Sequence, residues 1–380
     1  MTRILCISLT PIRRDARVLR QIDVLRELGE VTTVGHGDAP PGVADHIRVP
    51  DDKPSLPQTV GGVILLATRQ FDRAELAAPG VAYAAEKLEG RHFDLVVAND
   101  ARVLGLAFAV SGGAPVWADL HEWAPEERTH VLSWRLLVAP FMVHLCRKYL
   151  PRTAAATTVG GEIAELYDEN FGVRPLVMRN AAPFADLAPT PVSPDRIRLV
   201  HSGGAIHGRS LETMIDAVRA LDERFTLDLY LVPAADGGRY LSQLRNRAGG
   251  DPRVTFHEPV PPSDLPRTLN AYDVGVFWIP PVHTNARLTL PNKLFDFVQA
   301  RLAIAVGPTL EMERVVREYG LGVVGDDFTL EGCVRALANL TSDRVREYKE
   351  RSHAAARALS FDREREVALS MLRAVLPDRE

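Results

Sequence analysis

The feature that most constrains the fold of this chain is a regular alternation of short apolar runs with amphipathic segments along its whole length. Largely apolar runs of this length are typical of strands buried on both faces of a parallel sheet. Helical faces lie between the runs, as where Leu211, Ile215, Val218 and Leu221 share one side of a helix. A repetition of strand, helix and strand predicts an α/β fold with right-handed crossovers. The predicted strands are Ile4–Leu9, Val31–Val34, Leu95–Ala98, Val116–Leu120, Ala155–Val159, Ile197–His201, Leu227–Val232, Val254–Phe256, Val274–Trp278, Ile304–Val306 and Gly322–Val324.

The length of the chain and its prolines predict two domains. At 380 residues the chain exceeds one ordinary core, since domains average ~150 residues. The segment Ala182–Asp195 carries four prolines, so it cannot continue a helix or a central strand and is interpreted as a linker. Because each half opens with a strand, a turn and a helix, we predict two Rossmann-like, doubly wound domains that face each other across a cleft. The predicted boundaries are 1–185 for the N-terminal domain, 186–195 for the linker, 196–358 for the C-terminal domain and 359–380 for a closing helical segment.

Composition excludes several classes of partner. With 45 basic and 49 acidic residues the formal charge is 45 − 49 = −4, so we expect no nucleic-acid partner. Cys6, Cys146 and Cys333 lie far apart without metal-ligand spacing, which predicts reduced thiols, no bound metal and a cytoplasmic protein. No apolar run is long enough to span a bilayer. The segment 134–150 is compatible with a buried helix and also with peripheral contact at a membrane surface.

The strongest local signal is a glycine-rich turn after the first strand of the second half. Gly203, Gly204 and Gly208 let a ligand approach the backbone, and a helix is predicted to open near Ser210. Arg209 adds a full charge to the partial positive charge of that helix start, a combination that suits a diphosphate. The turn also nearly matches the Walker A pattern of nucleoside triphosphatases, with arginine in place of lysine. An ordinary capped turn is the structural alternative.

A second signal is the segment that opens with Pro291, a residue favoured at a helix start. Lys293 then falls in the first helical turn, where a cation opposes the helix dipole, so its presence there indicates an anionic ligand. Asp296 lies on the same face and can accept hydrogen bonds from a vicinal diol such as ribose. The alternative is a surface helix with a lysine–aspartate pair.

Two polar segments of the first half are also candidates. Asp119, His121 and Glu122 follow an apolar run, which places them at the carboxyl end of a strand, where a histidine can bind a sugar hydroxyl or move a proton. Asp15 and Arg17 lie in the turn after the first strand and can meet an acceptor or a phosphate. A structural loop histidine and an exposed charged turn are the respective alternatives.

Together these segments resemble the retaining GT-B glycosyltransferases of family four, the glycosyl transferases group 1. The matches occur in the family's order and span most of the chain. They are Asp15-Ala-Arg-Val-Leu-Arg, Asp119-Leu-His-Glu, Val177-Met-Arg-Asn-Ala-Ala-Pro, Gly208-Arg-Ser-Leu-Glu, Pro291-Asn-Lys-Leu-Phe-Asp-Phe and Leu359-Ser-Phe-Asp.

The resemblance implies a role for each candidate. Arg209, Lys293 and His121 would be catalytic, the two cations stabilising the leaving diphosphate without a metal or a cofactor and the histidine touching the transferred sugar or the acceptor. By the same resemblance, the nucleotide sugar would be a co-substrate, and the acceptor would be a small molecule, a glycan or a lipid-linked acceptor. The implied donor-binding residues are Gly203, Gly204, Gly208, Asn292, Asp296, Phe256 and Glu258, and the implied acceptor-side residues are Asp15, Arg17, Asp119 and Glu122.

Two departures from the family pattern leave the donor sugar open. The second of the family's paired acids is Asp296 here, and Leu288 replaces the first, so Thr284, Asn285 or loop amides are expected to hold the sugar instead. The first loop also lacks the family's paired glycines. A nucleotide-sugar 2-epimerase of the same fold and a non-catalytic nucleotide-sugar-binding protein remain the rival interpretations.

Overall fold

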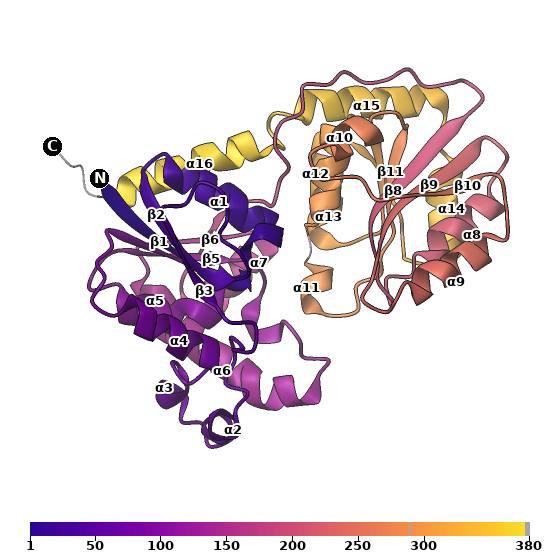
Figure 1. Ribbon diagram of the computed structural model, residues 1–380. Coiled ribbons are helices and arrows are strands. Elements are labelled where there is room, and N and C mark those ends of the chain that lie inside the picture. Colours follow the sequence, from indigo (N-terminus) through magenta and orange to yellow (C-terminus); the bar gives the residue numbers. More distant parts are fainter. Residues whose placement is uncertain (289, 377–380) are drawn as a thin grey trace. The chain divides into compact units, whose positions relative to one another are not determined.

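The computed structural model describes residues 1–288 and 290–376 (Figure 1). Residues 377–380, which end the predicted closing segment, lie outside the described residues. The chain divides into two compact units. Unit 1 comprises Met1–Arg179, His283–Asn285 and the segment that begins at Arg365, and unit 2 comprises Asn180–Val282 and Ala286–Glu364.

Unit 1 contains a parallel sheet in the order β3-β2-β1-β4-β5-β6-β7. Its strands are β1 (Thr2–Pro11), β2 (Gly29–His36), β3 (Asp45–Val49), β4 (Leu95–Asn99), β5 (Val116–Leu120), β6 (Ala155–Thr158) and β7 (Leu176–Val177). Its helices are α1 (Ala16–Arg26), α2 (Val60–Ala67), α3 (Phe71–Ala74), α4 (Pro79–Leu88), α5 (Leu104–Val110), α6 (Ala139–Tyr149) and α7 (Gly161–Phe171). A π-helical segment, Trp134–Val138, leads into α6, and the last helix, α16 (Phe361–Val375), enters unit 1 at Arg365.

Unit 2 contains a second parallel sheet, in the order β10-β9-β8-β11-β12-β13. Its strands are β8 (Ile197–Ala205), β9 (Phe225–Pro233), β10 (Val254–His257), β11 (Val274–Phe277), β12 (Ala303–Val306) and β13 (Gly322–Val324). Its helices are α8 (Glu212–Ala220), α9 (Arg239–Ala248), α10 (Leu265–Leu269), α12 (Asn292–Gln299), α13 (Leu310–Tyr319), α14 (Leu330–Ala338) and α15 (Ser342–Ala355), and α11 (Thr284–Arg287) has residues in both units.

The predicted fold class, α/β with two Rossmann-like domains, is confirmed by these two sheets. In each sheet the first strand of the unit is central and the chain then builds outward on both sides, which is the doubly wound order. The order reverses between β1 and β4 in unit 1 and between β8 and β11 in unit 2. Ligands of such sheets bind at the carboxyl ends of the strands at this point.

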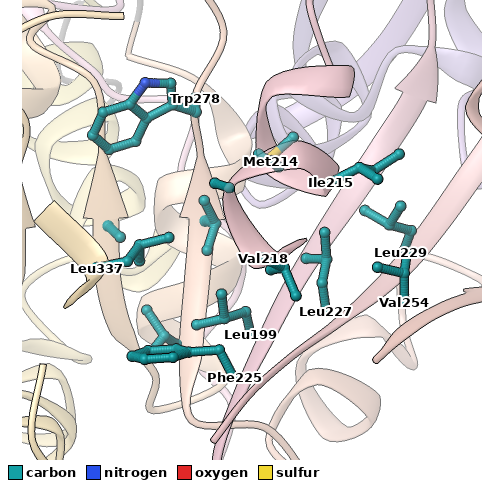
Figure 2. Packing of buried hydrophobic residues seen from close by; sticks show 14 of the residues in the cluster. Leu199, Met214, Ile215, Val218, Phe225, Leu227, Leu229, Val254, Trp278 and Leu337 are labelled. Carbon is teal, nitrogen blue, oxygen red and sulfur yellow. The ribbon is translucent and has the colours of Figure 1, made fainter. Parts of the chain in front are cut away.

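In the core of unit 2, the apolar face of α8 packs against strand β9. Met214, Ile215 and Val218 are fully buried and lie over Leu227 and Leu229 of β9 (Figure 2). Each such side chain contributes about 1.5–3 kcal/mol relative to leaving it in water. This packing anchors α8 and therefore the turn that precedes it.

A close approach of α12 to β11 positions the start of α12 near the place where the strand order reverses in unit 2. A Cβ atom added to Gly275 of β11 would lie 2.3 Å from Cγ of Phe297, which belongs to α12. Only glycine leaves room for the buried phenyl ring at this place. The start of α12 is thereby held next to the carboxyl end of β8. Within the described residues, no helix combines the length and apolar content needed to cross a bilayer.

Candidate functional site

The turn after β8 carries an arginine without an anionic partner. Arg209 is half-buried, and burial lowers its pKa. Within residues 1–288 and 290–376 no carboxylate pairs with its guanidinium, whose one hydrogen bond is a long contact from Nη1 to the Gly204 carbonyl at 3.5 Å. Removing a guanidinium from water without a counter-charge is unfavourable. The arrangement therefore suits an anion supplied by a ligand.

Lys293 lies in the first turn of α12, as predicted, and its ammonium donates to Oδ2 of Asp296 at 3.0 Å. The lysine–aspartate pair that was the structural alternative is thus formed. Both side chains are partly exposed, at 27% and 13%, so each retains surface for a ligand.

The two cations flank one dipeptide. A Cβ atom added to Gly203 would lie 3.7 Å from Cε of Lys293, and one added to Gly204 would lie 3.7 Å from Nη1 of Arg209. Gly203 and Gly204 lie at the carboxyl end of strand β8. An anion at this end of the strand therefore lies near the ammonium of Lys293 and the guanidinium of Arg209.

Sequence reasoning missed one residue of this site, His201 in β8. Its Nδ1 lies 2.8 Å from the Val276 carbonyl, whereas its buried Nε2 has no hydrogen-bond partner among residues 1–288 and 290–376. Burial lowers the pKa of His201 to about 4, and the charges of Lys293 and Arg209 act in the same direction. The imidazole is therefore neutral near pH 7. The signal in the sequence was a histidine in an otherwise apolar strand.

The backbone of the turn departs from the predicted helix start. Gly208 has φ +86° and Ser210 has φ +51°, a left-handed conformation that is unfavourable for serine. Helix α8 begins at Glu212 instead of near Ser210, because the left-handed residue interrupts helical dihedrals. Such strain is found at ligand-binding turns.

Phe256 lies in β10, Glu258 directly follows that strand, and Asn292 begins α12. Asn292 and Glu258 are exposed. Phe256 is partly buried against the core of unit 2, with the guanidinium of Arg245 5.3 Å from its ring centroid.

In unit 1 the carboxyl end of β5 holds a buried ion pair. Arg17 donates to both oxygens of Asp119, Nε to Oδ2 at 2.8 Å and Nη2 to Oδ1 at 2.5 Å, and also to the Met178 carbonyl at 2.7 Å. Gln21 and Thr157 donate to Asp119 at 3.1 and 2.7 Å. Burial alone would raise the pKa of Asp119, but the charge of Arg17, the contact with His121 and the hydrogen bonds from Arg17 hold it well below its usual range. Neither charged side chain is exposed, at 0% and 5%, so neither has surface for an acceptor.

His121 rests on this ion pair. Its Nε2 lies 3.3 Å from Oδ2 of Asp119 and 3.1 Å from Oδ1 of Asn99. Burial disfavours the imidazolium, but the carboxylates of Asp100 and Asp119 raise the pKa of His121. The backbone N–H of His121 donates to Asp100, which has φ +73°. Asp119 thus orients His121 and, with Asp100, favours its charged form, whereas the charge of Arg17 opposes that form.

A small cavity of about 120 Å³ opens beside His121. Although part of the Glu122 side chain faces solvent, the desolvation of its carboxyl group and the charges of Glu127 and Asp100 raise its pKa to about 7. The cavity is lined by Asp100, Ala101, Arg102, His121, Glu122, Ala124, Glu127 and Met142. Its polar walls suit hydroxyl groups or ordered water.

Other predicted residues of unit 1 have structural partners. Asp15 caps α1, and its Oδ1 accepts from the backbone N–H groups of Arg17 and Val18 at 3.2 Å. Asn285, expected to hold the sugar, donates to Oε2 of Glu122 at 3.2 Å and accepts from the Trp123 backbone N–H at 2.8 Å. Thr284 donates to Glu126.

A separate polar cluster in unit 1 joins Asp72, Glu75 and His144. Lys148 donates to both carboxylates, at 2.7 and 2.8 Å, and the Tyr149 hydroxyl donates to Glu75 at 2.6 Å. The ammonium thus neutralises the charge that would draw a cation, so we interpret the cluster as an ion-pair network.

Two doubly wound parallel sheets in consecutive units define the GT-B fold. No protein-family model matches the chain, and no curated protein matches its sequence. Among solved structures, the Anabaena protein Alr3699/HepE in complex with UDP and glucose is 15% identical, with coverage of 98% of this chain and 100% of that one and a TM-score of 0.69. Sucrose-phosphate synthase from Thermosynechococcus elongatus is 14% identical, with 99% of each chain covered and a TM-score of 0.69. Trehalose-6-phosphate synthase from E. coli, bound with UDP-2-fluoro glucose, is 12% identical, with 99% and 100% covered and a TM-score of 0.69.

Proposed function

We propose that the protein is a glycosyltransferase that moves a sugar from a nucleoside-diphosphate donor to a hydroxyl acceptor. The observation that carries this proposal is the position of Arg209 and Lys293 on either side of Gly203 and Gly204. Structural neighbours bound to UDP, UDP-glucose or UDP-2-fluoro glucose support a donor of this class. We assign donor binding to unit 2 and acceptor binding to unit 1.

In this proposal the reaction retains the configuration of the sugar. The bond from the anomeric carbon to the diphosphate oxygen breaks while the acceptor oxygen attacks from the same face. The proton of the acceptor hydroxyl moves to the departing diphosphate oxygen. Arg209 and Lys293 stabilise the negative charge that grows on that oxygen, as oxyanion-stabilising groups do. Because these residues supply the positive charge, we propose a metal-independent reaction.

The residues of unit 1 would act on the sugar and the acceptor. His121 and Glu122 line the small cavity, where both can bond sugar hydroxyls. Asp119 is a positioning residue in this proposal, since it contacts His121, and Arg17 acts through its ion pair with Asp119. All three cysteines are buried and free, which suits the reducing cytoplasm that we propose as the compartment.

We further propose that unit 1 meets an anionic membrane surface that carries the acceptor. Val60 and Ile64 of α2 and Leu132 and Leu136 near the π-helical segment are all exposed, and the two segments lie beside each other. Exposed arginines, including Arg135, border them. Aliphatic side chains edged by arginines fit an interface with acidic lipids.

Vesicle sedimentation tests this membrane contact. The wild type should bind vesicles that contain phosphatidylglycerol and should bind phosphatidylcholine vesicles less. Ile64→Asp should release it, whereas the exposed substitution Val282→Asp in unit 2 should not. Equal vesicle binding by the wild type and Ile64→Asp would contradict the proposed membrane contact and would not affect the proposal of a donor site in unit 2.

A thermal-shift panel followed by a turnover assay tests the proposed activity. One of UDP-, GDP-, ADP- or TDP-glucose should raise the melting temperature, since a ligand that binds only the native state stabilises it. The same donor should be hydrolysed slowly without an acceptor. Stabilisation without any hydrolysis or transfer indicates the non-catalytic binder, and change of configuration at the sugar C2 indicates the epimerase. Stabilisation by ATP alone indicates the nucleoside triphosphatase.

A further inference from the structure

In the donor site of unit 2, the buried imidazole of His201 has a ring nitrogen without a hydrogen-bond partner among the described residues. The side chain is 1% exposed. Its Nδ1 faces the Val276 carbonyl at 2.8 Å, and a carbonyl can only accept, so Nδ1 carries the proton. In the neutral ring Nε2 then presents a bare lone pair, and this atom has no hydrogen-bond partner within the part of the chain that the structure describes.

The unpartnered nitrogen faces the place where the anion is proposed to rest. A Cβ atom added to Gly203 would lie 3.5 Å from Nε2 of His201 and 3.7 Å from Cε of Lys293. The absence of a side chain at Gly203 leaves this space to a ligand. His201, Gly203 and Lys293 thus border one position at the end of β8.

The charges that face His201 explain why the imidazole is neutral before a ligand binds. Burial disfavours the imidazolium, and the ammonium of Lys293 and the guanidinium of Arg209 repel it. Phe277, whose ring centroid lies 6.1 Å from that of His201, adds an apolar neighbour. Asp296 already bonds Lys293 at 3.0 Å.

A bound diphosphate reverses this balance. It brings negative charge between the two cations, and its oxygens are acceptors that repel a lone pair but attract an N–H group. We propose that His201 takes up a proton at Nε2 from solvent when the donor diphosphate binds, and that its imidazolium then donates a hydrogen bond to a phosphate oxygen. This inference rests on the proposed function and adds a positioning residue for the diphosphate.

The sign of the pH dependence follows from linkage. The pKa of His201 is about 4 in the free protein and rises in the complex. The extra binding is therefore fully present below the free-state pKa and is lost as the pH rises through the bound-state pKa. Between these two values the donor affinity should fall by up to about tenfold for each pH unit.

Isothermal titration calorimetry of the full chain measures the proton directly. UDP-, GDP-, ADP- and TDP-glucose are suitable probes because their diphosphate diesters do not titrate between about pH 5 and pH 8, where histidine does. At about pH 6, titrations in buffers of different ionisation enthalpy should show uptake that approaches about one proton per donor bound.

Three variants assign that proton. His201→Asn and His201→Gln should bind the donor with no proton uptake. Both are made so that the test still works if one of them does not fold. His92→Asn, which changes an exposed histidine of unit 1, should retain the wild-type uptake. A merely structural role for His201 would change affinity without changing the proton count.

The outcomes separate the inference from the function on which it rests. Donor binding without proton uptake, or the same uptake in both His201 variants, overturns the role of His201 and leaves the diphosphate site in place. No binding of any of the four donors by the wild type overturns the donor site itself, and the role of His201 with it.

Discussion

The charged side chains at the carboxyl ends of the two sheets differ in whether they have a partner of opposite charge. In unit 1 the buried carboxylate of Asp119 is bonded to Arg17, Gln21 and Thr157, so its charge is balanced within the fold. In unit 2 the Arg209 guanidinium has no carboxylate partner among the described residues and the Nε2 atom of His201 has no partner at all. The paired charges of Asp119 and Arg17 stabilise the fold and orient the neighbouring histidine, whereas the Arg209 charge, which is not balanced by a carboxylate among the described residues, can bind a ligand.

The largest expected effect comes from breaking the complete pair. Asp119→Asn leaves the buried Arg17 charge without its partner, which should lower the free energy of unfolding by about 3–5 kcal/mol. Urea denaturation followed by circular dichroism measures the change. Asp222→Asn, which alters a surface pair with Arg224, is the matched control and should leave stability nearly unchanged. A small loss for Asp119→Asn would show that the pair is not a structural element.

Substitution of Arg209 should reduce turnover and leave stability nearly unchanged, in contrast to Asp119→Asn. Arg209→Ala should lower kcat ~10²-fold or more, by analogy with the loss of an oxyanion-stabilising donor, while the melting temperature stays near that of the wild type. Lys293→Ala should act in the same direction. Donor hydrolysis and thermal denaturation on the same preparations provide both readouts. Near-normal turnover rates in both variants would contradict the proposed catalytic role of the two cations.

A smaller effect is expected from filling the space between the groups of unit 2. Gly203→Ala adds a methyl group in ordinary contact with His201 and Lys293, at a residue whose φ of +158° is rarely adopted by residues with a side chain. The substitution therefore strains the backbone, and the diphosphate should bind less well, by about tenfold. Calorimetric dissociation constants for the donor measure this. Gly237→Ala, at a turn where the added Cβ would meet nothing within 4 Å, is the control for the cost of replacing a glycine, and its donor affinity should not change.

The mildest effect is the pH dependence of the stability that Asp119 provides. Its pKa is lower in the folded protein than in the unfolded chain, where aspartate titrates near ~3.9. The carboxylate therefore contributes stability that is fully present above the unfolded-state pKa and is lost as the pH falls through the folded-state pKa. The stability gap between wild type and Asp119→Asn should narrow as the pH falls below about 4. A gap that does not change with pH would mean that the charge of Asp119 contributes nothing.

Much of the fold was predictable because parallel strands buried on both faces are apolar throughout. The runs at Ile4–Leu9 and Ile304–Val306, for example, lie within β1 and β12. Strand β3, Asp45–Val49, was missed because it lies at the edge of its sheet and alternates polar with apolar residues. An edge strand lacks the second covered face that makes the others recognisable.

The candidate site was predictable only where local sequence carries the signal. Glycines before a helix and a lysine in a first turn pointed to Arg209 and Lys293 without any tertiary information. The partnership of Arg17 with Asp119 joins residues 102 positions apart, and no local pattern predicts which charges a fold will pair. His201 was missed for a related reason, since its open Nε2 depends on the neighbouring strand β11 that occupies Nδ1.

The most direct test is a crystal structure with the nucleoside diphosphate of the donor bound. The account predicts phosphate oxygens against Gly203 and Gly204, about 2.7–2.9 Å from nitrogen atoms of both Arg209 and Lys293. A diphosphate bound elsewhere, with the guanidinium and the ammonium both away from it, would contradict the account.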